Sequence, residues 1–150
     1  MKYIIQITIN KPLTECFNLL DDHSNMKHWQ AGLDSYEHIS GDPGMIGAKM
    51  KLNYTFGKRK MTLTETITHR DNNKAFHFNF DSKGMHNIQE NYFEAIDANT
   101  TQWTSKNQFA PTNFAMRMML MLMPKEFKKQ SKRYLIDFKN FAENGTSLLK

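Results

Sequence analysis

The stretch PKEFKKQSKRYLIDFKNFAENG, residues 124–145, carries a long periodic pattern. Its apolar and small side chains recur every three or four residues, which is the spacing of one face of an α-helix. These side chains are Phe127, Ser131, Tyr134, Leu135, Phe138, Phe141 and Ala142. Pro124 suits a first helical turn, and Gly145 suits the position that follows a last turn. We therefore predict an amphipathic helix of about 20 residues and about 30 Å.

The chain before this helix supplies a sheet that its apolar face can cover. A first strand is predicted over residues 2–10, and two short helices follow it, the second capped by Ser24. From residue 33 to residue 110 the side chains alternate with a period of two, as in antiparallel strands with one apolar face. Turns are indicated at residues 41–44, 57–58, 71–73, 83–84 and 97–99. We predict one α+β domain, residues 1–150, in which a curved antiparallel sheet of six to seven strands wraps around the long C-terminal helix.

The net charge of +5 comes largely from Lys and Arg between residues 125 and 139. We interpret these side chains as the solvated back of the long helix, and we expect no binding of nucleic acid. The longest apolar run, residues 114–123, contains Arg117 and is shorter than the roughly 20 residues that span a bilayer, so no stable membrane insertion is expected. The single cysteine, Cys16, cannot form an internal disulfide, which favours a cytoplasmic protein.

The sequence carries no familiar signature of metal or cofactor binding. It has no Gly-rich phosphate loop, no pair of cysteines and no nucleophile elbow. The six histidines, at positions 23, 28, 38, 69, 77 and 86, follow no metal-binding spacing. We expect neither a metal nor a cofactor, and the patterns favour no particular oligomeric state.

Several segments together resemble the START-related (SRPBCC) superfamily, whose members have the helix-grip fold. The resemblance covers residues 2–143 and begins with the alternating first strand, which leads into NKPLTECFNLLDD at 10–22 and then to Trp29. The segment ISGDPGMIGAKMKL at 39–52 also carries the resemblance, and YFEAIDANTTQW at 92–103 is similar to the family's penultimate hairpin. The closing segment LIDFKNFAE, at 135–143, is similar to the final helix of the family.

The resemblance implies a cavity between the concave face of the sheet and the long helix. In that family such a cavity commonly holds a lipid, a polyketide or another apolar molecule. Some members are cyclases or dehydratases, and one branch activates a chaperone, so the fold alone does not choose among a carrier, an enzyme and a protein-interaction domain. The third reading uses the basic face of the helix and predicts salt-sensitive association with an acidic partner.

The binding or carriage of a small apolar ligand is the function that these patterns favour. Large side chains gather on one face of consecutive strands, opposite the apolar stripe of the helix. The predicted ligand-binding residues are Tyr54, Phe56, Leu63, Glu65, Phe78, Phe80, Tyr92, Trp103, Met119, Tyr134 and Phe138.

Two carboxylates are candidates for catalysis of the cyclase or dehydratase type. Glu65 lies between Leu63 and Ile67 on the apolar side of its strand, and Glu90 is expected to share a face with Tyr92. A carboxylate inside an apolar cavity has a raised pKa and can serve as a general acid, a general base or a ligand anchor. A shift of one residue in the strand at 86–96 would reverse its faces. The inward residues would then be Asn87, Gln89, Asn91 and Phe93.

The methionine-rich segment at 114–123 is either core filler or a deformable lid. Its methionines cover nearly every side of a helix, so some of them face away from the core. Pro124 cannot continue a helix from the preceding turn, because it lacks an N–H and its ring clashes with the carbonyl four residues back. We therefore predict that residues 112–123 and 125–143 are not one straight helix.

Overall fold

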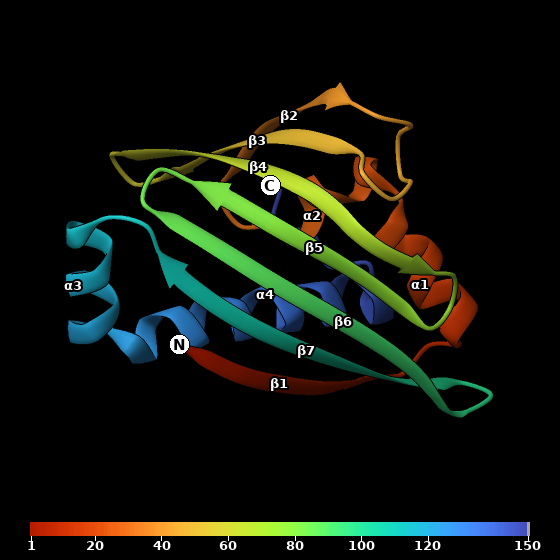
Figure 1. The fold of residues 1–150 in the computed structure, drawn as a ribbon. Coiled ribbons are helices and arrows are strands. Elements are labelled where there is room, and N and C mark those ends of the chain that lie inside the picture. The colour runs from red at the N-terminus through yellow and green to blue at the C-terminus, as the bar shows by residue number, and fades with distance from the viewer. Residues whose placement is uncertain (150) are drawn as a thin grey trace.

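The computed structural model describes residues 1–149, which form one antiparallel sheet and a set of helices on its concave side (Figure 1). The sheet has seven strands in the order β1-β7-β6-β5-β4-β3-β2. The strands are β1 (Lys2–Ile9), β2 (Leu33–Ser40), β3 (Lys49–Phe56), β4 (Arg59–Asp71), β5 (Ala75–Ser82), β6 (Met85–Asp97) and β7 (Thr100–Pro111). The predicted antiparallel sheet is confirmed, and β1 is placed at its edge by pairing with β7.

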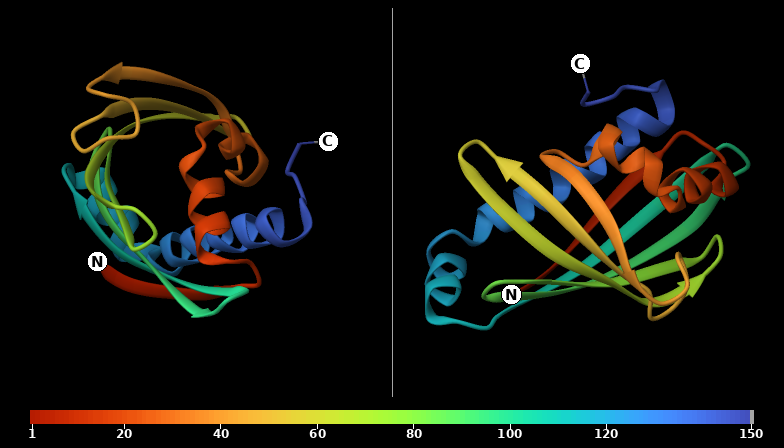
Figure 2. Two further views of the ribbon diagram at one scale, coloured as in Figure 1. Left: turned by 90° about the vertical axis from the view of Figure 1, so that its right-hand side faces the viewer. Right: turned by 90° about the horizontal axis from the view of Figure 1, so that it is seen from above.

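The helices lie on the inner side of the curved sheet. They are α1 (Leu13–Asp21), the 3-10 helix η1 (His23–Asn25), α2 (Met26–Trp29), α3 (Phe114–Leu122) and α4 (Pro124–Asn144). Figure 2 shows the sheet curling around α4, and Figure 1 shows α1 and α3 at opposite ends of the molecule. Irregular register within β4 and β6 accompanies this curvature, as β-bulges increase the local twist of a strand. Among residues 1–149, no helix combines the length and apolarity needed to cross a membrane.

The long C-terminal helix anchors one half of the core. Leu135, Phe138 and Ala142 of α4 are buried, as the periodicity predicts. Phe138 is fully buried, and its ring meets those of Trp29 and Trp103 edge-on, with centroids 5.2 and 5.4 Å apart. These contacts join α2, α4 and β7 behind the cavity that is described below.

The helix boundaries follow local capping chemistry. Helix α3 ends at Leu122 and α4 begins at Pro124, so the predicted break between them is confirmed. The prediction that Ser24 caps the second short helix is wrong. Helix α2 begins after Asn25 without a side-chain cap. The carboxylate of Asp22 caps the preceding η1, because its Oδ1 accepts hydrogen bonds from the backbone N–H and the hydroxyl of Ser24.

The first turn of α3 is docked onto the turn between β5 and β6. The side chain of Asn113 accepts a hydrogen bond of 2.8 Å from the backbone N–H of Met116 and so caps the helix. Gly84 has φ +85°, and a Cβ atom there would overlap the side chains of Asn113 and Met116. Two features therefore require a glycine at this position: the left-handed backbone conformation and the close approach of α3.

Candidate ligand-binding cavity

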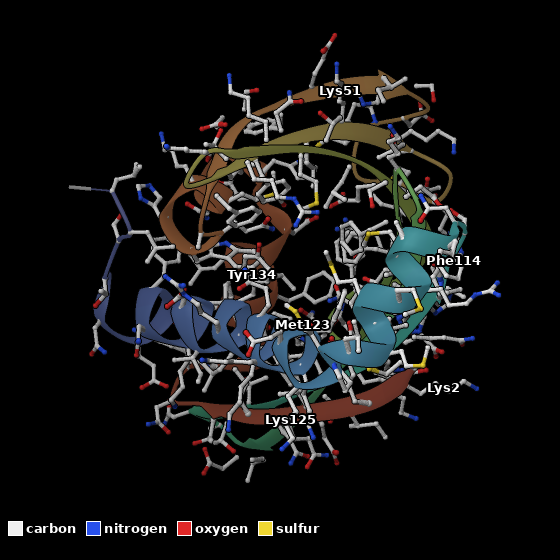
Figure 3. The ribbon with its side chains drawn as sticks, turned by 90° about the vertical axis from the view of Figure 1, so that its left-hand side faces the viewer. Lys2, Lys51, Phe114, Met123, Lys125 and Tyr134 are labelled. Atoms are coloured by element: carbon white, nitrogen blue, oxygen red, sulfur yellow. The ribbon has the colours of Figure 1, made fainter. Side chains whose placement is uncertain are left out.

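A cavity of about 530 Å³ lies between the inner face of the sheet and α4. Its wall is formed by the inner faces of β3 to β7, by the ends of α1, η1 and α2, and by α3 and the first half of α4. Figure 3 looks into the end of the molecule at which α3 lies, where Met123 and Tyr134 are labelled. A volume of this size falls in the range of pockets that hold small organic ligands.

Aromatic side chains make a large part of the wall on the sheet side. Phe76, Phe78 and Phe80 follow one another on the inner face of β5, with ring centroids 4.5 and 5.7 Å apart. On β3 the rings of Tyr54 and Phe56 are stacked, with centroids 5.8 Å apart. This row of aromatic side chains forms because alternate residues of a strand point to the same face.

Glu65 is the buried acid of this wall. It lies on β4, with Met50 and Phe80 as its cross-strand neighbours, and only 5% of its surface is exposed. Its carboxyl group makes neither a hydrogen bond nor an ion pair to any residue in 1–149. Burial raises its pKa from the ordinary 4.5 to about 7. The predicted inward orientation of Glu65 is confirmed, and its role in binding or catalysis remains a prediction.

Tyr54 and Tyr134 add hydroxyl groups to the cavity wall. The hydroxyl of Tyr54 donates a hydrogen bond of 2.5 Å to the side-chain oxygen of Gln30. Burial raises the pKa of Tyr54 well above its ordinary value, and the charges of Tyr134 and Glu65 contribute to the rise. Burial also raises the pKa of Tyr134. Both tyrosines are therefore neutral hydrogen-bonding groups at any physiological pH.

A row of amides covers the opposite part of the wall. The Nε1 of Trp103 donates to Oδ1 of Asn91 at 2.9 Å, and Nδ2 of Asn91 donates to Oε1 of Gln89 at 3.1 Å. Gln89 in turn donates to Asn107 at 3.4 Å. Because these polar groups satisfy one another, β6 and β7 can present them to the interior at little cost.

The cavity reaches the surface at the end where α3 lies. Exposed residues that still line it there include Arg59, Met123 and Glu126. Met116 and Met119 of α3 also lie on the wall, while Leu120 is the buried residue of that helix. The segment therefore forms part of the rim, between the cavity and the solvent.

Most of the predicted ligand-binding residues lie on the cavity wall. They are Tyr54, Phe56, Leu63, Glu65, Phe78, Phe80, Trp103, Met119 and Tyr134. Phe138 does not line the cavity, because its ring is enclosed between the two tryptophans of the core. Periodicity placed it on the correct face of α4 but not at the correct depth.

The predicted orientation of Glu90 and Tyr92 is wrong. Both point to the outer face of β6, where the hydroxyl of Tyr92 donates to a carboxylate oxygen of Glu90 at 2.6 Å. The amine of Lys106 lies over the ring of Tyr92, 5.2 Å from its centroid. These contacts give Tyr92 an outer surface on which to pack, although 36% of it is exposed.

The alternative orientation of this strand is the correct one. Asn87, Gln89 and Asn91 line the cavity, and Phe93 is buried beside them. The polar residues Gln30, Gln130 and Ser131 also line it and were not predicted. Ser131 lies on the predicted apolar stripe of α4, which was the available signal, whereas no pattern pointed to Gln30.

The histidines are dispersed over the fold. Within residues 1–149 no group of three or more His, Cys, Asp or Glu side chains is placed to hold a metal ion. His86 pairs with Asp81 at 2.5 Å, and His28 with Ser147 at 2.7 Å, both away from the cavity wall.

Known proteins resemble this chain in structure rather than in sequence. No family model and no curated protein matches the sequence. A conserved protein from Geobacillus kaustophilus is 14% identical, with a TM-score of 0.78 over 95% of each chain. Major latex-like protein 151 from Panax ginseng is 13% identical, with a TM-score of 0.73 over 95% of this chain and 97% of that one. The Zhui aromatase/cyclase from Streptomyces sp. R1128 is 12% identical, with a TM-score of 0.73 over 99% of each chain.

These likenesses extend over nearly the whole chain, so they show the complete arrangement of sheet and helices. The helix-grip fold predicted from the sequence resemblance is thereby confirmed. At such low identity the likeness concerns the fold alone, because unrelated functions share one fold.

Proposed function

We propose that this helix-grip domain binds one small apolar ligand, such as a lipid, a polyketide-like molecule or another apolar metabolite, between the sheet and α4. The observation that carries the proposal is the cavity of about 530 Å³ with its wall of aromatic and methionine side chains. Protein interiors are normally close-packed, so a cavity of this size lowers the stability of a small domain. An apolar ligand would restore the missing contacts.

The shape of the wall also supports the proposal. Methionine side chains at the rim adapt to irregular ligands, and the aromatic rows provide flat apolar faces deeper inside. The amides of β6 and the hydroxyls of Tyr54 and Tyr134 supply a few fixed polar groups. Pockets for small organic molecules combine a mainly apolar lining with a few such groups that fix orientation.

A matched pair of tryptophan variants tests the proposal. Leu63 points into the cavity, and Thr62 is exposed on the other face of the same strand. Leu63→Trp fills the cavity and is expected to weaken binding of the neutral probe N-phenyl-1-naphthylamine at least tenfold, as measured by fluorescence titration. Thr62→Trp is expected to leave the affinity within twofold. Equal affinities in both variants, or no binding by the unchanged protein, would overturn the proposal.

A second candidate function is enzymatic, with Glu65 as a general acid or base. It rests on the burial of this carboxyl group and on its pKa of about 7, which suits proton transfer near neutral pH. The unchanged protein would then accelerate exchange of the α-protons of an apolar β-keto ester for deuterium. Glu65→Gln would lower that rate on the order of 100-fold. If deuterium exchange with either protein is no faster than in buffer alone, the enzymatic function is excluded and ligand binding or carriage remains.

A further inference from the structure

Glu65 is an acid without a counter-charge on the apolar inner face of β4. Its strand neighbours on the inner face are Leu63 and Ile67, and its cross-strand neighbours are Met50 and Phe80. The residue has a relative exposure of 5%, and its carboxyl group has no hydrogen-bond donor among residues 1–149. Buried charges in proteins are normally paired, so an ionised Glu65 would lack the partner that such charges have.

The other acids on the cavity wall are differently placed. The carboxylate of Asp21 is held by the guanidinium of Arg70 through bonds of 2.6 and 2.7 Å. Glu126 is exposed at the rim, where water solvates it. Arg59 shares the inner side of β4 with Glu65 but lies six residues away, which is about 20 Å along a strand. His23, the other basic side chain on the wall, lies beside Asp21, Asp22 and Arg70. No cation on the wall within residues 1–149 therefore pairs with Glu65.

The surroundings of Glu65 suit a positive charge. Phe80 is the cross-strand neighbour of Glu65, and Tyr54 is close enough for the charge of Glu65 to act on its hydroxyl. Tyr134 lies near Tyr54 on the same cavity wall, and aromatic faces attract cations. An uncharged donor would satisfy one hydrogen bond of the carboxylate but not its charge. An anionic head group would be repelled by it. The combination of one acid and several aromatic faces is that of a site for an organic cation.

We propose that the ligand carries one protonated amine, which pairs with Glu65 while its apolar part lies against the aromatic wall. This inference rests on the proposed function and narrows its ligand class to amphiphilic amines. The ion pair requires an ionised Glu65 and a protonated amine. It is therefore favoured from about pH 7, the pKa of Glu65, up to about pH 10, where alkylamines lose their proton.

Three probes of equal chain length separate the possibilities: 1-decylamine, 1-decanol and decanoic acid. Their affinities are measured at pH 8.5 by displacement of N-phenyl-1-naphthylamine. The unchanged protein is expected to bind decylamine at least tenfold more tightly than decanol, and decanoate most weakly. At pH 5.5, where Glu65 is protonated, the preference for the amine is expected to fall below threefold.

Two variants assign the effect to Glu65. Glu65→Gln is expected to reduce the preference for decylamine to within threefold of decanol, without weakening decanol itself. Glu126→Gln removes an acid at the rim of the same cavity and is expected to retain the preference. Equal binding of decylamine and decanol by the unchanged protein overturns the inference and leaves the proposed function standing, whereas failure of all three probes to bind overturns both. A preference that survives in Glu65→Gln, or that is unchanged at pH 5.5, also overturns the inference.

Discussion

The carboxyl group of Glu65 changes its affinity for protons when the chain folds. Burial raises its pKa from 4.5 to about 7, so the folded chain holds a proton that the unfolded chain releases between these values. The stability that this proton contributes is full below about pH 4.5 and is lost as the pH rises through 7. A shift of this size corresponds to about 3 kcal/mol.

We therefore predict a pH-dependent effect of Glu65→Gln on the free energy of unfolding. Between pH 5 and pH 8 the variant gains about 2–3 kcal/mol relative to the unchanged protein, because Gln carries no charge to bury. Urea denaturation of both proteins at both pH values measures this difference. If the difference in unfolding free energy between the two proteins is the same at both pH values, folding does not raise the pKa of Glu65.

Trp103 and Trp29 allow a matched test of the amide row. Both rings pack edge-on against Phe138, and both are nearly fully buried. The Nε1 of Trp103 donates to Asn91, whereas the Nε1 of Trp29 has no acceptor within residues 1–149. We predict that Trp103→Phe lowers the free energy of unfolding by about 1–3 kcal/mol more than Trp29→Phe does, since only the former leaves a buried amide oxygen unpaired. Equal losses would mean that the hydrogen bond contributes nothing net.

At the scale of elements, α3 and α4 differ in how firmly they are held. Only Leu120 of α3 is buried, and Phe114, Met121 and Leu122 are largely exposed. Helix α4 is held by a buried stripe and ends at Gly145, a left-handed cap. The short helix therefore has the properties of a segment that opens locally, and the long one does not.

This contrast predicts the pattern of amide hydrogen exchange. In the unliganded protein the amides of residues 116–122 are expected to exchange faster than those of residues 130–140, and to slow when decanol is added. Exchange followed by mass spectrometry or NMR measures both segments at once. Equal protection of the two segments would make α3 ordinary core rather than a lid.

The strands show why part of the site was predictable and part was not. On β3 and β4 one face is apolar and the other polar, so the period of two indicated the inner face of each correctly. On β6 the inner face is polar instead, because Gln89 and Asn91 are satisfied by bonds to residues of β5 and β7. The sequence pattern of one strand carries no information on hydrogen-bond partners in other strands. It therefore favoured the aromatic Tyr92 over the polar Gln89 and Asn91 as an inward residue.

For the whole molecule, the order of elements along the sequence was enough to predict the fold. Which side chains line the cavity depends on how deeply each one is packed, and the sequence pattern does not contain that information. The long apolar stripe, the run of turns and the early proline together predicted a sheet wrapped around one helix. They did not predict which inward side chains touch the cavity, since Phe138 and Tyr134 share one helix face and only Tyr134 lines it. That difference depends on where α2 and its tryptophan lie along α4.

The central claim is that an apolar ligand occupies the cavity between the sheet and α4. The methionine methyl groups can serve as probes of its position. The chain has eleven of them. Those on the cavity wall are Met26, Met61, Met85, Met116, Met119 and Met123. The others are Met1, Met45, Met50, Met118 and Met121. Met45 and Met121 are exposed to solvent and serve as internal controls.

The decisive measurement is the set of nuclear Overhauser effects between decanol and the methionine methyl groups, in protein labelled with ¹³C at those groups. The account predicts contacts from the ligand chain to methyl groups of the wall, including the buried Met26 and the partly buried Met61, and none to Met45 or Met121. Contacts confined to Met45 or Met121, or no contacts at saturating decanol, would contradict it.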